Sequence, residues 1–501
     1  MQELSISPLP TPSYDREDWK RGYQSQPEET DYWIDEVTGT IPPDLTGTIF
    51  RNGPGLTDVA GTPLAHPFDG DGMICRFTFK GGRAHFSNRY VRTEGYLAEQ
   101  AAGRILYRGV FGTQKPGGVF ANAFDLRIKN IANTHVLPWG GKLLALWEAA
   151  EPHGLDPATL ETLGLDRLDG VLKPGDAFAA HPRIDPMGAA GRWGENGAGQ
   201  RRLVNFAVKP GLSTTITIYE FDEAGALRSR HSHSVPGFAF LHDFALTPNY
   251  CIFFQNPVTF NPLPYVLGFR SAAQCIQFDA KQPTRAIVIP RNPEAGPVKV
   301  LETQPCFVFH HANAHEADGQ IIVDSVCYES FPSVDPDTDF REIEFDSLPA
   351  GQLWRYSLDL AAGTVHSRLM EARSCEFPTL HPNAVGRSQR YLYIGAAHDP
   401  KGNGPLQGIL KLDLETGARS LWSAAPRGFM SEPLFVPRPG GTAEDDGWVI
   451  VTVYNAANHR SEVAILEAWN WAAGPVATLH LRQHVPYGLH GSYTPTCFIE
   501  D

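Results

Sequence analysis

The chain has 501 residues, 42% of them hydrophobic and 20% charged, so it can bury a large core and is typical of a globular protein. A net charge of -14, with no local cluster of Lys and Arg, disfavours nucleic acid as a partner. Seven widely spaced cysteines, none in a CxxC pair, indicate reduced thiols in a cytoplasmic protein and disfavour a disulfide framework or a thiolate zinc site.

The first 40 residues are polar and rich in proline, with Trp19, Tyr23 and Trp33 as large anchors. We expect them to form an N-terminal arm wrapped over the main body. The start of the chain has no apolar signal sequence, and no uncharged apolar stretch reaches the length of about 18 residues that a membrane span requires.

From about residue 41 onward, strand patterns with a period of two alternate with turns rich in Gly and Asp. Hairpins are predicted at 75–87, 216–230, 353–367 and 409–422. Repeated hairpins along one chain favour an all-β fold and a propeller in particular, with the whole chain, 1–501, as a single domain.

Longer segments interrupt the hairpins, at 94–130, 150–200 and 255–273. Insertions of this kind are expected on one face of a repeat architecture, where binding sites form. Helical periodicity is brief and is confined to the neighbourhoods of 94–104 and 157–168.

Histidines supply the candidate chemistry, although a single histidine is usually structural. The richest segment is CFVFHHANAHE at 306–316, where an apolar strand leads into His310 and His311. Its HHxxxH spacing is not that of a helical zinc protease motif.

Single histidines and glutamates also stand in other apolar strand-and-turn segments. A buried glutamate needs a partner, and a metal-bound imidazole with a free N–H is a suitable one. Spacing alone does not select these residues over His398 or His459. The candidates are Glu148, His181, His242, Glu376, His381, Glu432 and His490.

The succession of motifs resembles the carotenoid cleavage oxygenase family from about residue 36 to the C-terminus. The motifs are RNGPG at 51–55, FDGDGM at 68–73, FHHANAHE at 309–316, EFP at 376–378, SEP at 431–433 and GLHGSY around His490. The resemblance implies a seven-bladed β-propeller, capped by a dome of loops and short helices, with Fe(2+) on the propeller axis.

The resemblance also implies the roles of individual residues. Thr134 matches a small residue near an open coordination position of the iron. His311 would point away from the axis. The implied iron ligands are His181, His242, His310 and His490, and the carboxylates that orient three of them are Glu148, Glu376 and Glu432.

Within the family, the stretch LWEAAEPHGLDP resembles cyanobacterial apocarotenoid oxygenases. These relatives use O2 to cut apocarotenals at the central 15,15' bond, giving retinal and a second aldehyde. An apolar polyene and O2 are therefore the implied partners, without an obligate protein partner. The implied substrate-binding residues are Phe68, Phe111, Trp147, Phe240, Phe309, Tyr328 and Phe377.

Three alternatives stay open at this point. A stilbene-cleaving dioxygenase of the same family is the main one, although Trp147 offers no charge to a phenol. A non-oxidative isomerase would use the same four histidines, and a metal-free propeller scaffold would leave the three glutamates without partners.

A long apolar substrate has to be drawn from a membrane. The uncharged segment NPVTFNPLPYVLGF at 256–269 carries large apolar residues and three prolines, which favours a non-helical lip that dips into lipid. We therefore expect a cytoplasmic protein that associates peripherally with membranes.

Overall fold

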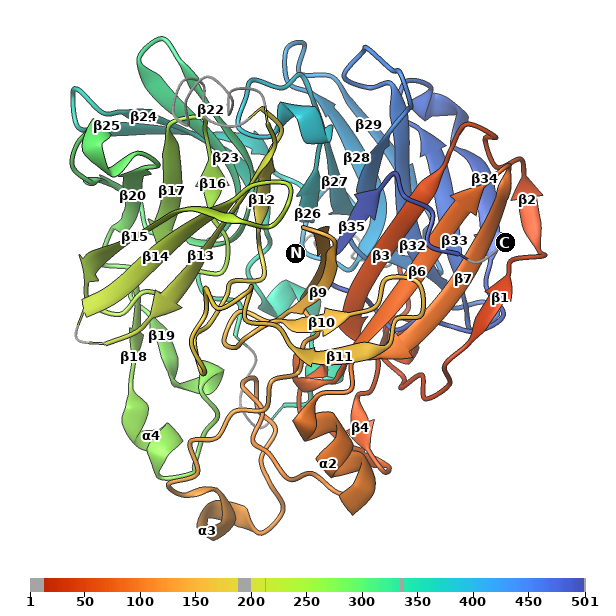
Figure 1. Cartoon of the computed structure of the whole chain (residues 1–501), viewed down its shortest axis with the longest axis horizontal. Helices are drawn as coiled ribbons and strands as arrows, with labels where there is room; N and C mark the ends of the chain where they lie inside the picture. Colours follow the sequence, from red (N-terminus) through yellow and green to blue (C-terminus); the bar gives the residue numbers. More distant parts are fainter. Residues whose placement is uncertain (1–12, 188–199, 212, 334–337, 500–501) are drawn as a thin grey trace, which may run out of the picture.

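The computed structural model describes residues 13–187, 200–211, 213–333 and 338–499, and the strands of this part of the chain form a seven-bladed propeller around a central axis (Figure 1). All strand pairs within the blades are antiparallel, as expected for blades made of consecutive hairpins.

We number the blades in chain order and give their strands from the axis outward. Blade 1 contains β35 (Gly491–Thr494), β3 (Gly47–Pro54), β6 (Gly72–Lys80), β7 (Arg83–Tyr90) and β1 (Asp31–Trp33). Blade 2 contains β8 (His135–Trp139), β9 (Lys142–Leu146), β10 (His153–Leu155) and β11 (Thr162–Leu165). Blade 3 contains β12 (Arg183–Asp185), β13 (Arg202–Lys209), β14 (Ser213–Phe221) and β15 (Leu227–Pro236). Blade 4 contains β16 (Ala245–Leu246), β17 (Tyr250–Gln255), β20 (Thr284–Pro290) and β21 (Lys299–Thr303).

The remaining blades follow the same plan. Blade 5 contains β22 (Phe307–Ala317), β23 (Gln320–Tyr328), β24 (Gln352–Asp359) and β25 (Thr364–Glu371). Blade 6 contains β26 (Cys375–Thr379), β27 (Tyr391–Ala397), β28 (Leu406–Asp413) and β29 (Arg419–Ser423). Blade 7 contains β30 (Gly428–Met430), β31 (Leu434–Pro437), β32 (Gly447–Asn455), β33 (Arg460–Glu467), β34 (Pro475–His480) and β2 (Val37–Gly39).

Strands from both ends of the chain close the ring. The C-terminal strand β35 is the innermost strand of blade 1, where Thr494 pairs with Thr48 of β3. The N-terminal strand β2 is the outermost strand of blade 7, where Val37 pairs with Leu479 of β34. The region expected to form an arm therefore contributes β1 and β2 to two blades, while residues 1–12 lie outside the described part.

All four predicted hairpins are confirmed, in the pairs β6–β7, β14–β15, β24–β25 and β28–β29. Helical periodicity near 94–104 corresponds to α2 (Glu94–Ala102), which Thr93 caps. The prediction of a helix near 157–168 is wrong, because this segment forms a turn and β11. Segment 150–200 was expected to be an insertion between hairpins, but it contains the blade strands β10, β11 and β12.

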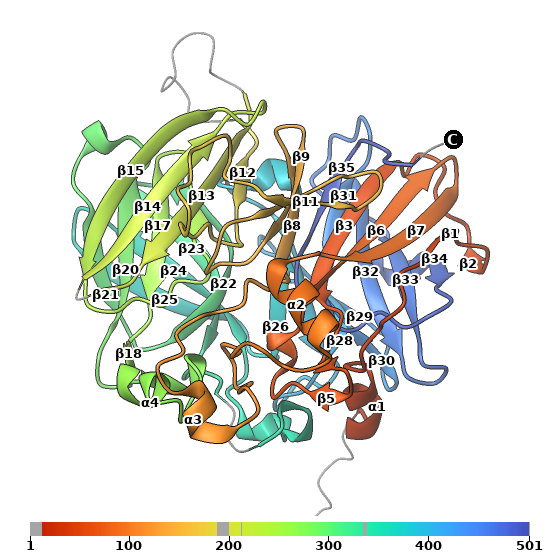
Figure 2. The ribbon, with the colours of Figure 1, turned by 60° about the horizontal axis from the view of Figure 1, so that its bottom comes forward.

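Short elements of the cap gather on one side of the ring (Figure 2). They include α1 (Arg16–Arg21), α3 (Gly118–Asn122) and α4 (Pro262–Val266), and the two-stranded sheets β4–β5 (Asp58–Val59, Thr62–Pro63) and β18–β19 (Val258–Phe260, Ile276–Phe278). The 3-10 helices are η1 (Pro67–Asp69), η2 (Ala273–Cys275), η3 (Pro293–Ala295), η4 (Phe340–Glu342), η5 (Phe345–Ser347), η6 (Pro382–Ala384) and η7 (Trp471–Ala473). No helix among the described residues is long and apolar enough to cross a membrane.

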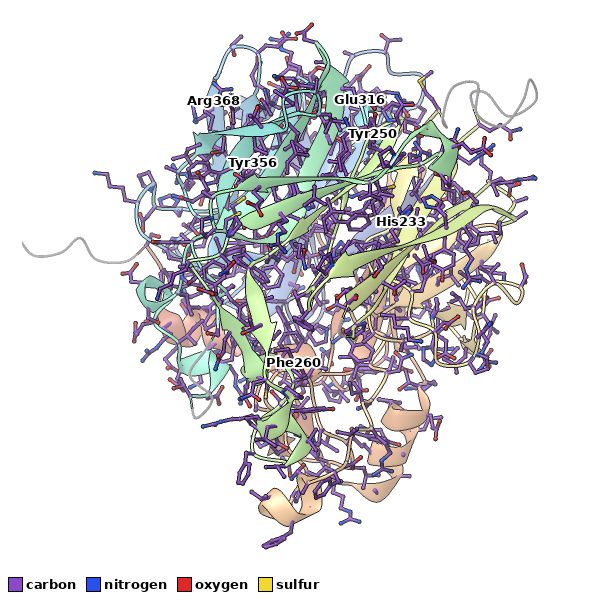
Figure 3. The ribbon with its side chains drawn as sticks, turned by 90° about the vertical axis from the view of Figure 1, so that its left-hand side faces the viewer. His233, Tyr250, Phe260, Glu316, Tyr356 and Arg368 are labelled. Atoms are coloured by element: carbon purple, nitrogen blue, oxygen red, sulfur yellow. The ribbon has the colours of Figure 1, made fainter. Side chains whose placement is uncertain are left out.

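The hydrophobic core lies between neighbouring blades. Apolar side chains of β17 and β20 pack against those of β23 and β24, with Tyr356 fully buried among them, and Figure 3 views this part of the ring from outside. Burial of each large apolar side chain contributes about 1.5–3 kcal/mol. This packing fixes the blades relative to one another, and therefore fixes the side chains that meet on the axis.

Candidate metal centre and cavity

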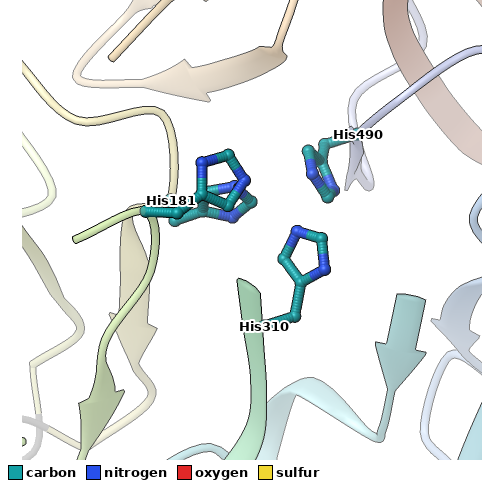
Figure 4. A group of neighbouring side chains, drawn as sticks. His181, His310 and His490 are labelled. Carbon is teal, nitrogen blue, oxygen red and sulfur yellow. The ribbon is translucent and has the colours of Figure 1, made fainter. Parts of the chain in front are cut away.

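Four histidines from four blades converge on the axis (Figure 4). His490 precedes β35, and His181 and His242 lie just before β12 and β16, so these three residues stand where an inner strand begins. His310 lies within β22. One ring nitrogen from each histidine lies within 4.8 Å of those of the other three.

A β-bulge explains how His310 reaches the axis. The pairing of β22 with β23 shifts between Val308, opposite Cys327, and His311, opposite Ser325. A bulge re-aims the side chains at that point. His310 joins the cluster, while Nδ1 of His311 lies 2.7 Å from Ser325 Oγ in the interior of the blade.

The four imidazoles are arranged as metal ligands. His181 Nε2 and His242 Nε2 lie 2.9 Å apart, and His310 Nε2 is buried without a hydrogen-bond partner among the described residues. Burial, followed by repulsion from the neighbouring histidines, holds the pKa of His181 and of His490 well below 6.5. Both rings are therefore neutral at pH 7 and can offer a lone pair to a metal ion.

A carboxylate stands behind three of the four rings. Glu148, which follows β9, has Oε2 at 2.6 Å from His242 Nδ1. Glu376 of β26 and Glu432, between β30 and β31, lie 2.6 Å from His310 Nδ1 and 2.9 Å from His490 Nδ1.

These contacts at Nδ1 leave Nε2 of each ring directed to the centre, and carboxylates in this position raise the basicity of a metal ligand. His181 has no carboxylate partner among the described residues. The structure thus brings together all seven residues that the sequence analysis assigned to the metal site.

The RNGPG motif supports the site in a way that the sequence did not reveal. Asn52 Nδ2 donates to the carbonyl oxygens of Ala132 and His135, at 2.8 and 2.9 Å. Its backbone N–H donates to the carbonyl oxygen of His490. Asn52 therefore couples blades 1 and 2 directly beside a metal-ligand residue. The only signal for this role was the motif itself.

His135 is a further residue that sequence reasoning missed. Its Nδ1 lies 2.9 Å from the carbonyl oxygen of Ala180, and its Nε2 lies 3.1 Å from both the carbonyl oxygen of Gly491 and Ser492 Oγ. These contacts join the segments that carry His181 and His490.

Thr134 is buried immediately before β8. Its hydroxyl donates to Asn133 Oδ1 at 3.2 Å, and its carbonyl oxygen accepts the backbone N–H of His490 at 3.1 Å. Thr134 is therefore fixed next to a ligand-bearing segment.

A cavity of about 340 Å³ reaches the site. Glu376 and Leu489, the neighbour of His490, line it, and five of the seven proposed substrate contacts also line it: Phe68, Phe111, Phe309, Tyr328 and Phe377. Phe240 lies outside this lining and packs against Phe309, with ring centroids 6.4 Å apart. Trp147 lines a separate cavity of about 20 Å³, beside Asp69.

Comparisons with known proteins agree with this geometry. A family model described as "Retinal pigment epithelial membrane protein" matches residues 23–495. The apocarotenoid-15,15'-oxygenase of Synechocystis sp. is 54% identical, over 97% of this chain and 97% of that protein. The lignostilbene-alpha,beta-dioxygenase isozyme III of Sphingomonas paucimobilis is 30% identical, over 91% of this chain and 93% of that protein.

Solved structures extend the likeness to the fold. The crystal structure of the cobalt-substituted apocarotenoid oxygenase of Synechocystis matches with a TM-score of 0.94 at 54% identity, covering 97% of this chain and 100% of that one. The chain therefore belongs to the family of carotenoid cleavage oxygenases and retinal pigment epithelial membrane protein.

Proposed function

We propose that the protein is an iron(II) dioxygenase that cleaves apocarotenals at the central 15,15' double bond, giving retinal and a second aldehyde. The observation that carries the proposal is the four-histidine centre beside an aromatic cavity, in a chain 54% identical to an apocarotenoid-15,15'-oxygenase. Iron(II) in this centre would supply the activation of O2 next to the double bond.

The residues of the chain have separate tasks in this reaction. His181, His242, His310 and His490 would hold the ion through their ring nitrogens, and Glu148, Glu376 and Glu432 fix the orientation of three of the rings. The methyl group of Thr134 would restrict access to the ion. The cavity positions the double bond and excludes water.

Aromatic side chains suit a rigid polyene because a flat conjugated chain can lie against their faces. Phe68, Phe111, Phe309, Tyr328 and Phe377 would contact it directly. Phe240 would support Phe309 from behind, and Trp147 would act from the neighbouring small cavity, next to Glu148.

We further propose that the protein takes its substrate from a membrane through α3, α4 and the residues around them. Large apolar side chains are exposed there: Phe120 by 99%, Phe124 by 75%, Leu263 by 61% and Phe269 by 57%. Segment 256–269 contributes only part of this surface, and it includes the helix α4 where the sequence suggested a non-helical lip.

The exposed residues belong to one rigid unit. The backbone N–H of Phe124 donates to the carbonyl oxygen of Val266 at 2.7 Å. The buried Arg108 guanidinium donates to the carbonyl oxygens of Asn122, Tyr265 and Arg270. Exposed apolar side chains held in place in this way favour insertion among lipids, so we expect a cytoplasmic protein bound peripherally to membranes.

Incubation with apocarotenals and with a phenolic stilbene, followed by mass analysis of the products, tests the proposed reaction. Two aldehydes from central cleavage of the apocarotenal are expected. Cleavage of the stilbene alone would replace the proposal by the alternative that the lignostilbene dioxygenase represents.

A further inference from the structure

Several of the polar side chains that line the cavity already have protein partners. Tyr328 OH donates to Glu376 Oε1 at 2.9 Å. Ser374 Oγ donates to Asn403 Oδ1 at 2.7 Å, and Asn403 Nδ2 donates to the carbonyl oxygen of Phe345 at 3.0 Å. Ser333 also lines the cavity but is exposed to solvent.

His66 differs from these residues because one of its ring nitrogens makes no hydrogen bond within the described part of the chain. Nδ1 accepts the backbone N–H of Phe68 at 3.0 Å and thereby caps η1. An imidazole nitrogen that accepts a hydrogen bond carries no proton, so the ring proton is on Nε2. Among the described residues, Nε2 has no hydrogen-bond partner, and His66 lines the cavity.

Three aromatic rings hold this imidazole in place. The ring centroids of Phe340, Phe68 and Phe111 lie 4.2, 4.7 and 5.2 Å from that of His66. Burial lowers the pKa of His66 to about 3, and the negative charge of Asp339 opposes this shift only in part. The ring is therefore neutral at pH 7 and presents a single N–H donor, held beside these three aromatic rings.

We propose that His66 Nε2 donates a hydrogen bond to an oxygen at one end of the bound polyene, either an aldehyde carbonyl or a hydroxyl group. This inference rests on the proposed function, which supplies the class of substrate. A polyene without oxygen would remove water from the Nε2–H group and leave it unpaired. A site built around a donor therefore discriminates against such a ligand.

Two variants separate this role from the capping role. His66→Ser keeps a hydroxyl that can accept the Phe68 N–H, but its side chain is too short to reach a ligand. His66→Asn keeps the acceptor and adds an amide donor on a longer side chain. Binding is measured with metal-free protein through quenching of tryptophan fluorescence, because Trp19 also lines the cavity. The ligands are an apocarotenal, the corresponding alcohol and an oxygen-free polyene of equal length.

The expected result is a selective loss of affinity. His66→Ser should weaken binding of the oxygenated ligands by roughly 3- to 10-fold relative to the oxygen-free polyene, and His66→Asn should restore part of this difference. In the iron-loaded enzyme the loss should appear in KM and leave kcat nearly unchanged. Loss with the aldehyde alone identifies a carbonyl acceptor, and loss with the alcohol alone identifies a hydroxyl.

An equal effect on all three ligands would overturn the inference, because it would reflect a change in cavity shape. The test does not depend on turnover. If the wild-type protein binds with the expected preference but yields no aldehydes, the proposed reaction fails while the hydrogen bond from His66 stands.

Discussion

Arg51 Nη1 lies 3.8 Å from Oε2 of Glu432, and the other carboxylate oxygen of Glu432 lies 2.9 Å from His490 Nδ1. All three side chains are largely buried. Burial raises the pKa of Glu432, and the positive charge of Arg51 opposes this rise. With iron(II) bound, the charges of the ion, the three glutamates and Arg51 sum to zero.

This relationship predicts strong coupling between Arg51 and Glu432. Loss of one member of a buried charge pair costs about 3–5 kcal/mol, because the other charge stays buried. Arg51→Met and Glu432→Gln should each destabilise the metal-free protein, and the double variant should lose less than the sum of the two. Equilibrium unfolding of the four proteins measures the coupling. Additive losses would show that the two residues act independently.

Replacement of Glu148 should affect metal binding with little effect on folding, whereas replacement of Glu376 should affect both. Glu376 also accepts hydrogen bonds from Tyr328 OH and from its neighbour's backbone, whereas Glu148 shows no side-chain contact among the described residues beyond its approach to His242 Nδ1. Glu148→Gln should therefore leave unfolding nearly unchanged and weaken metal binding by about 10- to 100-fold. Competition with a chelator measures the affinity. Metal binding equal to that of the wild type would show that Glu148 does not contribute to the metal site.

The exposed apolar surface predicts binding to lipid vesicles. Replacement of Phe120 and Phe124 by Ser should release the protein from liposomes that bind the wild type, because these side chains supply much of the exposed apolar area. Leu163, 71% exposed on β11 of blade 2, provides a matched control, and Leu163→Ser should have no effect. Equal sedimentation of all variants with the vesicles would argue against a role of this surface in membrane binding.

The buried His153 should make the stability of the folded protein sensitive to acid. Burial lowers its pKa to about 4, below the ordinary value of 6.5. Between these values the unfolded chain binds a proton that the folded protein excludes, so stability falls as the pH falls from 6.5 to 4. The loss from this residue amounts to at most about 3 kcal/mol.

His153 Nδ1 is buried without a hydrogen-bond partner among the described residues, so leucine can replace the ring without breaking a bond to Nδ1. Thermal unfolding at pH 7 and pH 4.5 should show a smaller drop in Tm for His153→Leu than for the wild type. Identical drops would mean that His153 does not titrate with folding.

The sequence predicted the hairpins because a period of two and a turn rich in Gly and Asp are local signals, as at 216–230. The helix expected near 157–168 failed because β11 completes blade 2 by pairing with β10, and this tertiary contact outweighs local periodicity. The metal-site histidines come from distant segments, so only the order of motifs along the chain could select them.

Other parts of the site carried no usable local signal. Arg51 and Asn52 act on residues at least 80 positions away in the chain, and they do so across blade boundaries. The exposed surface around α3 was missed because Phe120 and Phe124 stand in a segment without strand or strong helix periodicity, and only the fold places them beside α4.

The iron content of anaerobically purified protein tests the central claim most directly. The wild type should contain about one iron per chain, and His310→Ala should lose iron while the protein keeps its β-sheet content and its unfolding transition. A correctly folded wild-type protein that takes up no iron, or a His310→Ala variant that retains it fully, would contradict the four-histidine centre.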